Sequence, residues 1–397
     1  MISERNYKRM ATEVLEILKL YPEEMQDKVP EKLIAEFEKN RLPDMKVKLD
    51  TSKKLHEQEL CDETLVMVYM IYRNYIAKPD EKAHFEISED ESKAVSVIPG
   101  AGKDSLCTKD GSLKIDVVFP ALHGTYGEDG TIQGLLDMAD IPYVGCQTMA
   151  SALTMDKEKT KQVLEASGVP VVPYICMKRS DLNNSSRYDE VFQRCIEELG
   201  LPLFVKPCCA GSSNGAHKCS TAKELSFYLM DAFLWDDKVL IEKSINAREI
   251  ECSVTGNSVT ANPNNEDETV KAYIPGEITP THEFYDFDAK YNDPDGAALR
   301  IPADLSTDLI ETVRSTAVKA YKALDCAGLS RVDFFINKDD GSIYLNEVNT
   351  MPGFTPISMF PKMCEKAGMT FEQITNMLVS EAILRHNAKN QLTTSRQ

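Results

Sequence analysis

The chain has 397 residues and a formal net charge of −18, with apolar and charged fractions typical of a globular protein. This length allows two or three domains with substantial cores, and the negative charge argues against nucleic acid or anionic membranes as partners. The first residues carry no secretion signal, and the longest apolar run, residues 65–72, is too short to cross a bilayer. The eleven cysteines are therefore expected to be reduced thiols of a cytoplasmic protein.

The first 83 residues are predicted to be helical. Apolar residues recur at helical spacing over 6–20, 30–40 and 62–77, and residues 78–80 are typical of a linker. We identify no candidate chemistry in this segment.

From residue 84 onward the pattern predicts short strands and helices. Residues 84–97 and 112–120 are expected to be strands, and the apolar run KIDVVFPAL suits a buried parallel strand. The glycine-rich turn HGTYGEDGTIQG follows and leads into a helix near Thr131. Backbone N–H groups and the positive end of a helix dipole are therefore expected at the end of the strand.

Two lysines are expected near a bound anion. Lys157 lies in the first turn of a helix, where the helix dipole disfavours a cation; the alternative is a solvated lysine. Lys206 ends the strand LPLFVKP and precedes the small-residue loop CCAGSSNG, whose N–H groups and hydroxyls can bind phosphate. Within that loop, Cys208 and Cys209 are either a redox pair or small residues that fill space.

Three later segments have clear patterns. Residues 284–299 contain too many Asp and Gly residues for a regular element, which is typical of an active-site lid. Residues 306–324 and 371–385 have the apolar spacing of helices, and residues 386–397 are polar and expected to be disordered.

A β-hairpin is predicted between these two helices, from RVDFFI, the turn sequence NKDDGS and IYLNEVN. With a turn centred near Asp340, Asp333 lies opposite Glu347 and Arg331 lies opposite Asn349, so the four side chains share one face. Carboxylate and amide oxygens suit Mg²⁺ or Mn²⁺, and the guanidinium could stabilise a phosphoryl group or a tetrahedral intermediate. The alternative is the solvated face of an edge hairpin.

The segments RVDFF and LNEVNTMPGFTPIS closely resemble the metal-binding end of the ATP-grasp fold, as found in D-alanine–D-alanine ligases, and the resemblance runs from about residue 84 to about residue 386. It implies a fold that contains both helices and sheets (α/β in the broad sense), namely the α+β ATP-grasp fold. Antiparallel sheets are expected in a central and a C-terminal subdomain. The expected domains are a helical segment (1–83), a remnant of the N-terminal α/β substrate domain (84–147), the central subdomain (148–245), the C-terminal subdomain with the metal site (246–388) and a tail (389–397).

The resemblance also implies roles for individual residues and predicts ATP and two Mg²⁺ or Mn²⁺ ions as cofactors. The implied metal ligands are Asp333, Glu347 and Asn349. The implied catalytic groups are Arg331, Ser212, Tyr291 and the backbone N–H of Gly353. The residues expected to contact ATP are Lys157, Lys206, Ser213, Glu242, Lys243, Ile245, Glu249 and Lys290. The residues expected to contact the amino-acid substrates are His123 and Ser358.

The implied activity is the ATP-dependent synthesis of D-alanyl–D-alanine for peptidoglycan. The carboxylate of the first D-alanine attacks the γ-phosphorus of ATP, and the amine of the second D-alanine attacks the resulting acyl phosphate. Tyr291 corresponds to the version of the lid that forms a dipeptide. The family further implies small-molecule partners and a homodimer.

The sequence departs from the family near its start, where it lacks the Gly-Gly-x-Ser-x-Glu-His turn that helps to bind the first D-alanine. Three hypotheses therefore remain open. They are an active D-alanine–D-alanine ligase, an ATP-grasp ligase for another amino-acid pair, and a non-catalytic ATP-binding protein whose helical segment docks a partner. A mis-joined reading frame is a further explanation for residues 1–83.

Overall fold

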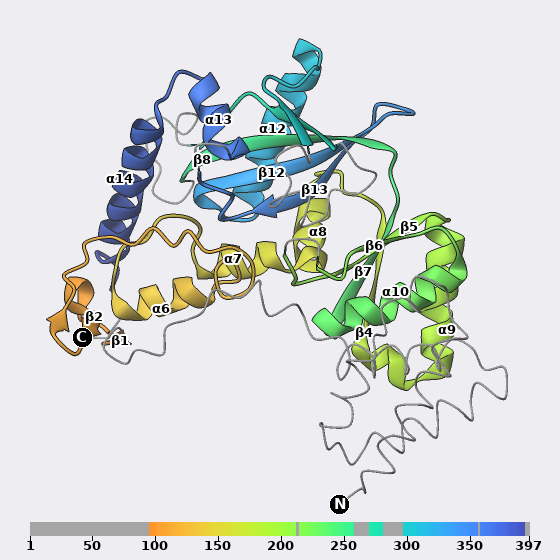
Figure 1. Ribbon diagram of the computed structural model, residues 1–397, viewed down its shortest axis with the longest axis horizontal. Helices are drawn as coiled ribbons and strands as arrows, with labels where there is room; N and C mark the ends of the chain where they lie inside the picture. The colour runs from red at the N-terminus through yellow and green to blue at the C-terminus, as the bar shows by residue number, and fades with distance from the viewer. Residues whose placement is uncertain (1–94, 212–213, 258–269, 281–296, 356–357, 394–397) are drawn as a thin grey trace, which may run out of the picture. The chain divides into compact units, whose positions relative to one another are not determined.

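The computed structural model describes residues 95–211, 214–257, 270–280, 297–355 and 358–393 (Figure 1). The expected helices over residues 1–83 lie outside these ranges, as do residues 284–296 of the lid expected over 284–299. The expectation of an irregular segment is wrong for residues 297–299, which belong to a β-strand (Ala297–Arg300). The described residues divide into two compact units. The first comprises residues 178–206 and 215–239, and the second comprises the remainder.

A six-stranded antiparallel sheet is the main element of the second unit (Figure 1). Its strands follow the order β11-β10-β8-β12-β13, and β9 also pairs with β8. Their bounds are β8 (Ala247–Asn257), β9 (Val270–Ala272), β10 (Gly276–Pro280), β11 (Ala297–Arg300), β12 (Ala327–Asn337) and β13 (Ile343–Asn349).

Each face of this sheet packs against its own helices, because side chains alternate between the faces along every strand. On one face, Ile250 and Phe334 pack with Val313 and Tyr321 of α12 (Thr307–Ala323). On the other face, Leu329 belongs to an apolar cluster with α13 (Met359–Lys366) and α14 (Phe371–Lys389).

A four-stranded sheet has the order β4-β7-β5-β6. Its strands are β4 (Tyr174–Lys178), β5 (Leu203–Pro207), β6 (His217–Cys219) and β7 (Lys238–Lys243). The helical elements of the first unit are η4 (Arg179–Asn183), α9 (Ser185–Arg194), the π-helical turn η5 (Cys195–Leu199) and α10 (Ala222–Trp235). Arg179 holds η4 against the end of α10 by donating hydrogen bonds to the carbonyls of Phe233 and Asp236.

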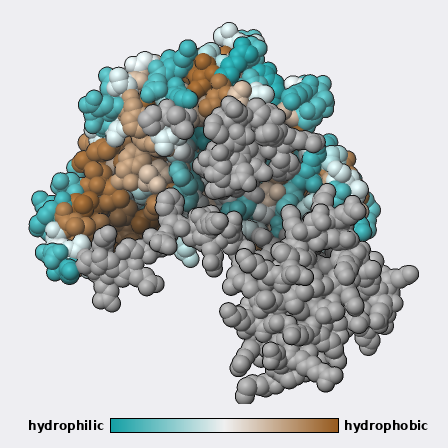
Figure 2. Space-filling model, in the orientation of Figure 1, coloured by the Kyte–Doolittle hydropathy of each residue, from teal (hydrophilic) through white to brown (hydrophobic). Residues whose placement is uncertain are grey.

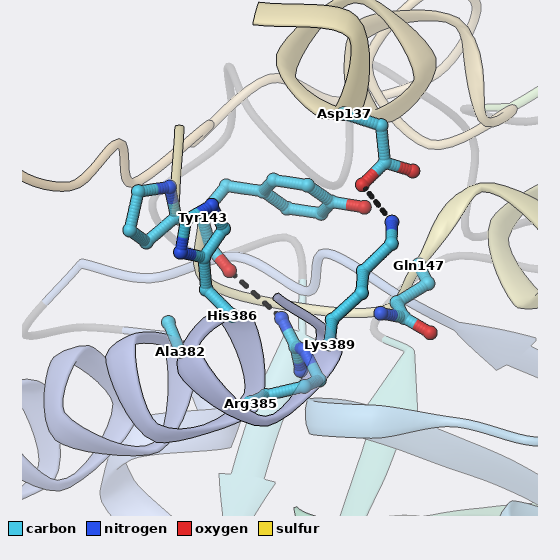
Figure 3. A pocket seen from close by; sticks show the side chains of 8 residues that line it. Asp137, Tyr143, Gln147, Ala382, Arg385, His386 and Lys389 are labelled. Carbon is cyan, nitrogen blue, oxygen red and sulfur yellow. Dashed lines mark hydrogen bonds and ion pairs between the residues drawn. The ribbon is translucent and has the colours of Figure 1, made fainter. Parts of the chain in front are cut away.

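The earliest described residues form small elements of the second unit. These are β1 (Ser96–Val97), η3 (Gly102–Asp104), β2 (Leu106–Thr108), β3 (Gly111–Ser112), α6 (Thr131–Ala139), α7 (Thr148–Met155) and α8 (Lys157–Ala166). The C-terminal end of α14 packs against α6 and the segment that follows it: Lys389 pairs with Asp137 of α6, and Arg385 donates to the carbonyl of Tyr143 (Figure 3). Two parts of the chain that are distant in sequence are thereby joined.

The helices expected after Lys157, Ser306 and Thr370 are confirmed. The strand expected over 112–120 is wrong. Val118 forms only an isolated parallel bridge to Tyr143, and Lys114 has a φ of 54°, which interrupts an extended backbone. The expectation that residues from 386 onward are disordered is wrong for the first of them, because α14 continues to Lys389.

One broader expectation can be compared with the described part of the chain. No helix there is both long and apolar enough to cross a membrane. The domain boundaries remain predictions.

Candidate active site

The hairpin of β12 and β13 pairs as predicted at its open end. Asp333 lies opposite Glu347, and Arg331 lies opposite Asn349. Within the described residues β12 is an interior strand, because β8 pairs along its other side, and β13 ends the strand order, so the hairpin lies at one end of the sheet. The four side chains therefore lie on the face of a continuous sheet.

A β-bulge at Asn346 sets this arrangement. Nearer the turn, Phe334 lies opposite Leu345, and the register then shifts by one residue before Asp333. Because side chains alternate with a period of two, an unbulged continuation would place Asn346 opposite Asp333 and turn Glu347 to the other face. The bulge thus puts Glu347 on the face that carries Asp333.

Arg331 is the centre of a polar network on this face. Its Nε and Nη2 donate to Oδ1 and Oδ2 of Asp333 at 2.8 and 2.7 Å, which is a bidentate pair. Nδ2 of Asn349 donates to the same Asp333 Oδ2 at 2.9 Å. A further carboxylate, Glu251 of β8, lies 3.2 Å from Arg331 Nε.

Burial and neighbouring charge act in opposite directions on Arg331. Burial disfavours its charged form, but the carboxylates of Asp333, Glu251 and Glu347 outweigh that effect and raise the pKa of the guanidinium above its usual value. Arg331 is therefore a permanent cation held among three acids.

Lys157 contacts the small-residue loop, and its predicted role beside a bound anion remains a prediction. Its Nζ donates to the carbonyl of Ala210 at 2.8 Å, and its backbone N–H donates to the carbonyl of Cys208 at 3.1 Å. The helix is capped by Asp156, which accepts from the backbone N–H of Lys159. The cation is thus placed beside the loop predicted to bind phosphate, whose Ser212 and Ser213 lie outside the described residues.

The residues expected to contact the nucleotide lie on β7, on β8 and between them. Glu242 is 3% exposed and pairs with the buried Lys161 at 2.6 Å, so its carboxylate is already neutralised by a cation. Lys243 is exposed, and Ile245 and Glu249 are half-buried. Lys206 belongs to the first unit, where it is buried on β5.

The glycine-rich turn after Val118 contacts the end of the hairpin. His123 Nδ1 lies 2.9 Å from the carbonyl of Met351, two residues beyond Asn349. Glu128 accepts from the backbone N–H of Gly124 at 2.6 Å and of Met351 at 3.3 Å. Burial raises the pKa of Glu128 above its ordinary value, although both N–H groups favour its charged form.

Gly353 and Ser358 meet in the loop between β13 and α13. A Cβ atom on Gly353 would lie 2.9 Å from Oγ of Ser358, so a larger residue would displace that hydroxyl. Ser358 Oγ also accepts from the backbone N–H of Thr355 at 3.1 Å. The two residues predicted to contact reacting groups therefore adjoin each other.

Two comparisons identify the relatives of this chain. The family model described as "D-ala D-ala ligase C-terminus" matches residues 163–380, and the one described as "D-ala D-ala ligase N-terminus" matches residues 46–146. A D-alanine–D-alanine ligase from Treponema denticola is 53% identical over 319 residues, which are 80% of this chain and 84% of the relative. The chain belongs to the D-alanine–D-alanine ligase family.

Solved structures agree with this membership and with an ATP-grasp fold. A D-alanine–D-alanine ligase from Coxiella burnetii superposes with a TM-score of 0.64 at 34% identity, and the match covers 75% of this chain and 76% of that one. A D-Ala:D-Ser ligase from Enterococcus faecalis superposes with a TM-score of 0.62 at 35% identity, covering 72% and 79%. The N-terminal family match begins at residue 46. This is upstream of residue 84, where the resemblance was expected to begin.

Two carboxylates beside the predicted site residues, Glu251 and Glu128, were not among the candidates from the sequence. Glu251 lies in the pattern AREIEC, where alternation with Glu249 was a usable signal because the two share a face of β8. Glu128 lies within the glycine-rich motif itself. Lys290 and Tyr291 lie outside the described residues, so their roles remain predictions.

Proposed function

We propose that the chain is an ATP-dependent ligase that joins two D-alanine molecules for peptidoglycan precursor synthesis and releases ADP and phosphate. The observation that carries this proposal is the polar face of the hairpin, with Arg331 held between Asp333 and Glu251 in a chain that belongs to the ligase family. A carboxylate is a poor acyl donor until it is phosphorylated. Fixed cationic groups around the phosphoryl group are what that step needs.

Asp333, Glu347 and Asn349 fit a divalent cation of the Mg²⁺ type. Within the described residues no three His, Cys, Asp or Glu side chains converge into a metal cluster. Two carboxylates and one amide are the kind of partial ligand set that Mg²⁺ shares with substrate phosphates and water. The Asn349 amide uses Nδ2 on Asp333, which leaves its oxygen as the coordinating atom. Bound there, the cation would neutralise charge on the transferred phosphoryl group.

The protein groups have separate roles in the proposed reaction. Arg331 and the N–H of Gly353 stabilise the oxyanion that forms on the attacked carbonyl. Lys157 and the small-residue loop hold the ATP phosphates, with Lys206 as a further point charge. His123 and Ser358 orient the amino-acid substrates.

We further propose a cytoplasmic homodimer. A surface for a second copy is supported by large exposed apolar side chains on α6, α7 and α14, and Figure 2 shows apolar surface over the region where Figure 1 places α6 and α14. These side chains are Leu135, Met138, Met149 and Leu384. Light scattering on the full chain measures the assembly directly.

The proposed activity is tested by ADP release from Mg·ATP by the full chain, with D-alanine, with L-alanine and without either. We expect release that depends on D-alanine, with D-alanyl–D-alanine in the product. Glu347→Gln is expected to lower turnover by about 100-fold, because the amide keeps the shape and loses the charge. Glu372→Gln, on the exposed start of α14, is the matched control.

A second candidate is a ligase for another amino-acid pair, favoured by the D-Ala:D-Ser ligase among the solved structures and by the missing Gly-Gly-x-Ser-x-Glu-His turn. D-Serine together with D-alanine is therefore a further arm of the same assay. A mixed dipeptide formed faster than D-alanyl–D-alanine would select this candidate. ATP binding without turnover on any amino acid would select a non-catalytic protein.

A further inference from the structure

Three carboxylates form a row across neighbouring strands of the large sheet. In the pairing of β8 with β12, Glu251 lies opposite Asp333, and in the pairing of β12 with β13, Asp333 lies opposite Glu347. Directly opposed residues share a face of a sheet. Glu251 therefore belongs to the same polar face as the proposed metal ligands, on the side of Asp333 that is remote from Glu347.

The hydrogen bonds on this face make Asp333 a crowded acceptor. Its two oxygens accept from Nε and Nη2 of Arg331 and from Nδ2 of Asn349, three of roughly four lone-pair directions. A cation that binds Asp333 must share it with the guanidinium. Two positive groups on one carboxylate repel each other, and the repulsion is strong where water is scarce.

Glu251 offers Arg331 a second anion. It is 6% exposed, and its Oε1 lies 3.2 Å from Arg331 Nε. With Glu251 the face carries three carboxylates and one guanidinium, a formal charge that one divalent cation balances. Without it, Asp333 would be the main anion that holds the guanidinium, with Glu347 as a weaker influence.

We propose that Glu251 is a positioning residue that anchors the Arg331 guanidinium toward β8, so that Asp333 and Glu347 can take a divalent cation while Arg331 stays aimed at the reacting carbonyl. The inference rests on the proposed function, because it assumes that Asp333 and Glu347 bind the metal. Glu251 itself touches neither the metal nor the substrate.

The sheet offers a matched control for a test of this role. Arg248 and Glu277 form another half-buried pair, bidentate at 2.7 Å for both bonds, on β8 and β10. Glu277 lies opposite Ile250, so this pair occupies the opposite face from Glu251. Glu277→Gln therefore removes the same charge as Glu251→Gln. It does so beside Arg248, an arginine of β8, on the face of the sheet away from the site.

The experiment measures Mn²⁺ affinity of the full chain with ADP, from the electron paramagnetic resonance signal of free Mn²⁺, for wild type, Glu251→Gln and Glu277→Gln. We expect Glu251→Gln to weaken Mn²⁺ binding about tenfold, since Arg331 then competes for Asp333 with a charge-assisted bond, and to lower kcat with little change in KM for ATP. Glu277→Gln is expected to leave Mn²⁺ binding unchanged. Glu251→Asp, which keeps the charge, is expected to recover part of the loss.

A double-mutant cycle separates positioning from a general effect of charge. In an Arg331→Gln background there is no guanidinium to anchor, so Glu251→Gln should no longer weaken Mn²⁺ binding. Equal weakening in both backgrounds, or unchanged binding by Glu251→Gln, would overturn the proposal. If Arg331→Gln does not fold, the comparison of Glu251→Gln with Glu251→Asp and Glu277→Gln decides it. If the wild-type chain binds no Mn²⁺, both the proposed metal site and this role of Glu251 are wrong. If wild type binds Mn²⁺ but the variants do not behave as expected, only the role of Glu251 is wrong and the proposed ligase function stands.

Discussion

Arg331 has a structural and a chemical role that two substitutions can separate. Arg331→Lys keeps the positive charge between Asp333 and Glu251 but cannot make the bidentate pair at 2.7 and 2.8 Å. We expect this variant to fold and to lose about 100-fold or more in kcat. Arg331→Met leaves the buried Glu251 and the half-buried Asp333 without their cation and is expected to lose about 3 kcal/mol of unfolding free energy. Urea denaturation and steady-state kinetics measure both; near-normal turnover of Arg331→Lys would contradict the oxyanion role.

At the scale of the element, the start of β12 depends on a close approach between backbones. Gly328 has a φ of 72°, and a Cβ there would lie 2.9 Å from the backbone nitrogen of Gly145. Gly341, in the hairpin turn, has a φ of 75° and open space around it. Gly341→Ala should therefore cost only about 1 kcal/mol of backbone strain, and Gly328→Ala about 1–3 kcal/mol more from the clash. Equal losses in urea denaturation would show that Gly145 can move away.

The hairpin also shows which features of the fold and of the candidate site could be predicted from the sequence and which could not. The opposed pairs at its open end were predicted from alternation and a turn centred near Asp340, and they are confirmed. The bulge at Asn346 was not predicted, although it left a signal in the sequence: the apolar Leu345 and Val348, both buried, are three residues apart, which breaks a period of two. Glu251 was missed because its partner Arg331 is eighty residues distant in sequence, and strand pairing alone brings them together. In the same way, the continuation of α14 to Lys389 depends on Asp137 and Tyr143, which no local pattern reveals.

At the scale of the whole chain, the last helix stabilises the second unit through contacts that span more than half of the sequence. Arg385 is 5% exposed, and it donates to the carbonyl of Tyr143 at 2.8 Å (Figure 3). It also donates to Glu381 at 3.2 Å. Arg385→Met should lower the unfolding free energy by about 3 kcal/mol, because Glu381 and a buried carbonyl lose their donor. Lys389→Met, one turn later, removes an exposed pair with Asp137 and should cost about 0.5 kcal/mol.

The loss in Arg385→Met is expected to depend on pH. Burial raises the pKa of Glu381 above its ordinary value, while Arg385 and Asn257 oppose that rise. A carboxyl group whose pKa is higher in the folded state than in the unfolded state favours folding below its unfolded pKa, and this contribution is lost as pH rises through the folded pKa. Without Arg385 the pKa of Glu381 rises further, so the carboxyl group is protonated more readily. Once protonated it is neutral, and at low pH it therefore does not need the cation. The stability difference between wild type and Arg385→Met should therefore be larger at about pH 8 than at about pH 5.5 in urea denaturation. A difference independent of pH would show that the carbonyl of Tyr143, and not Glu381, accounts for the loss.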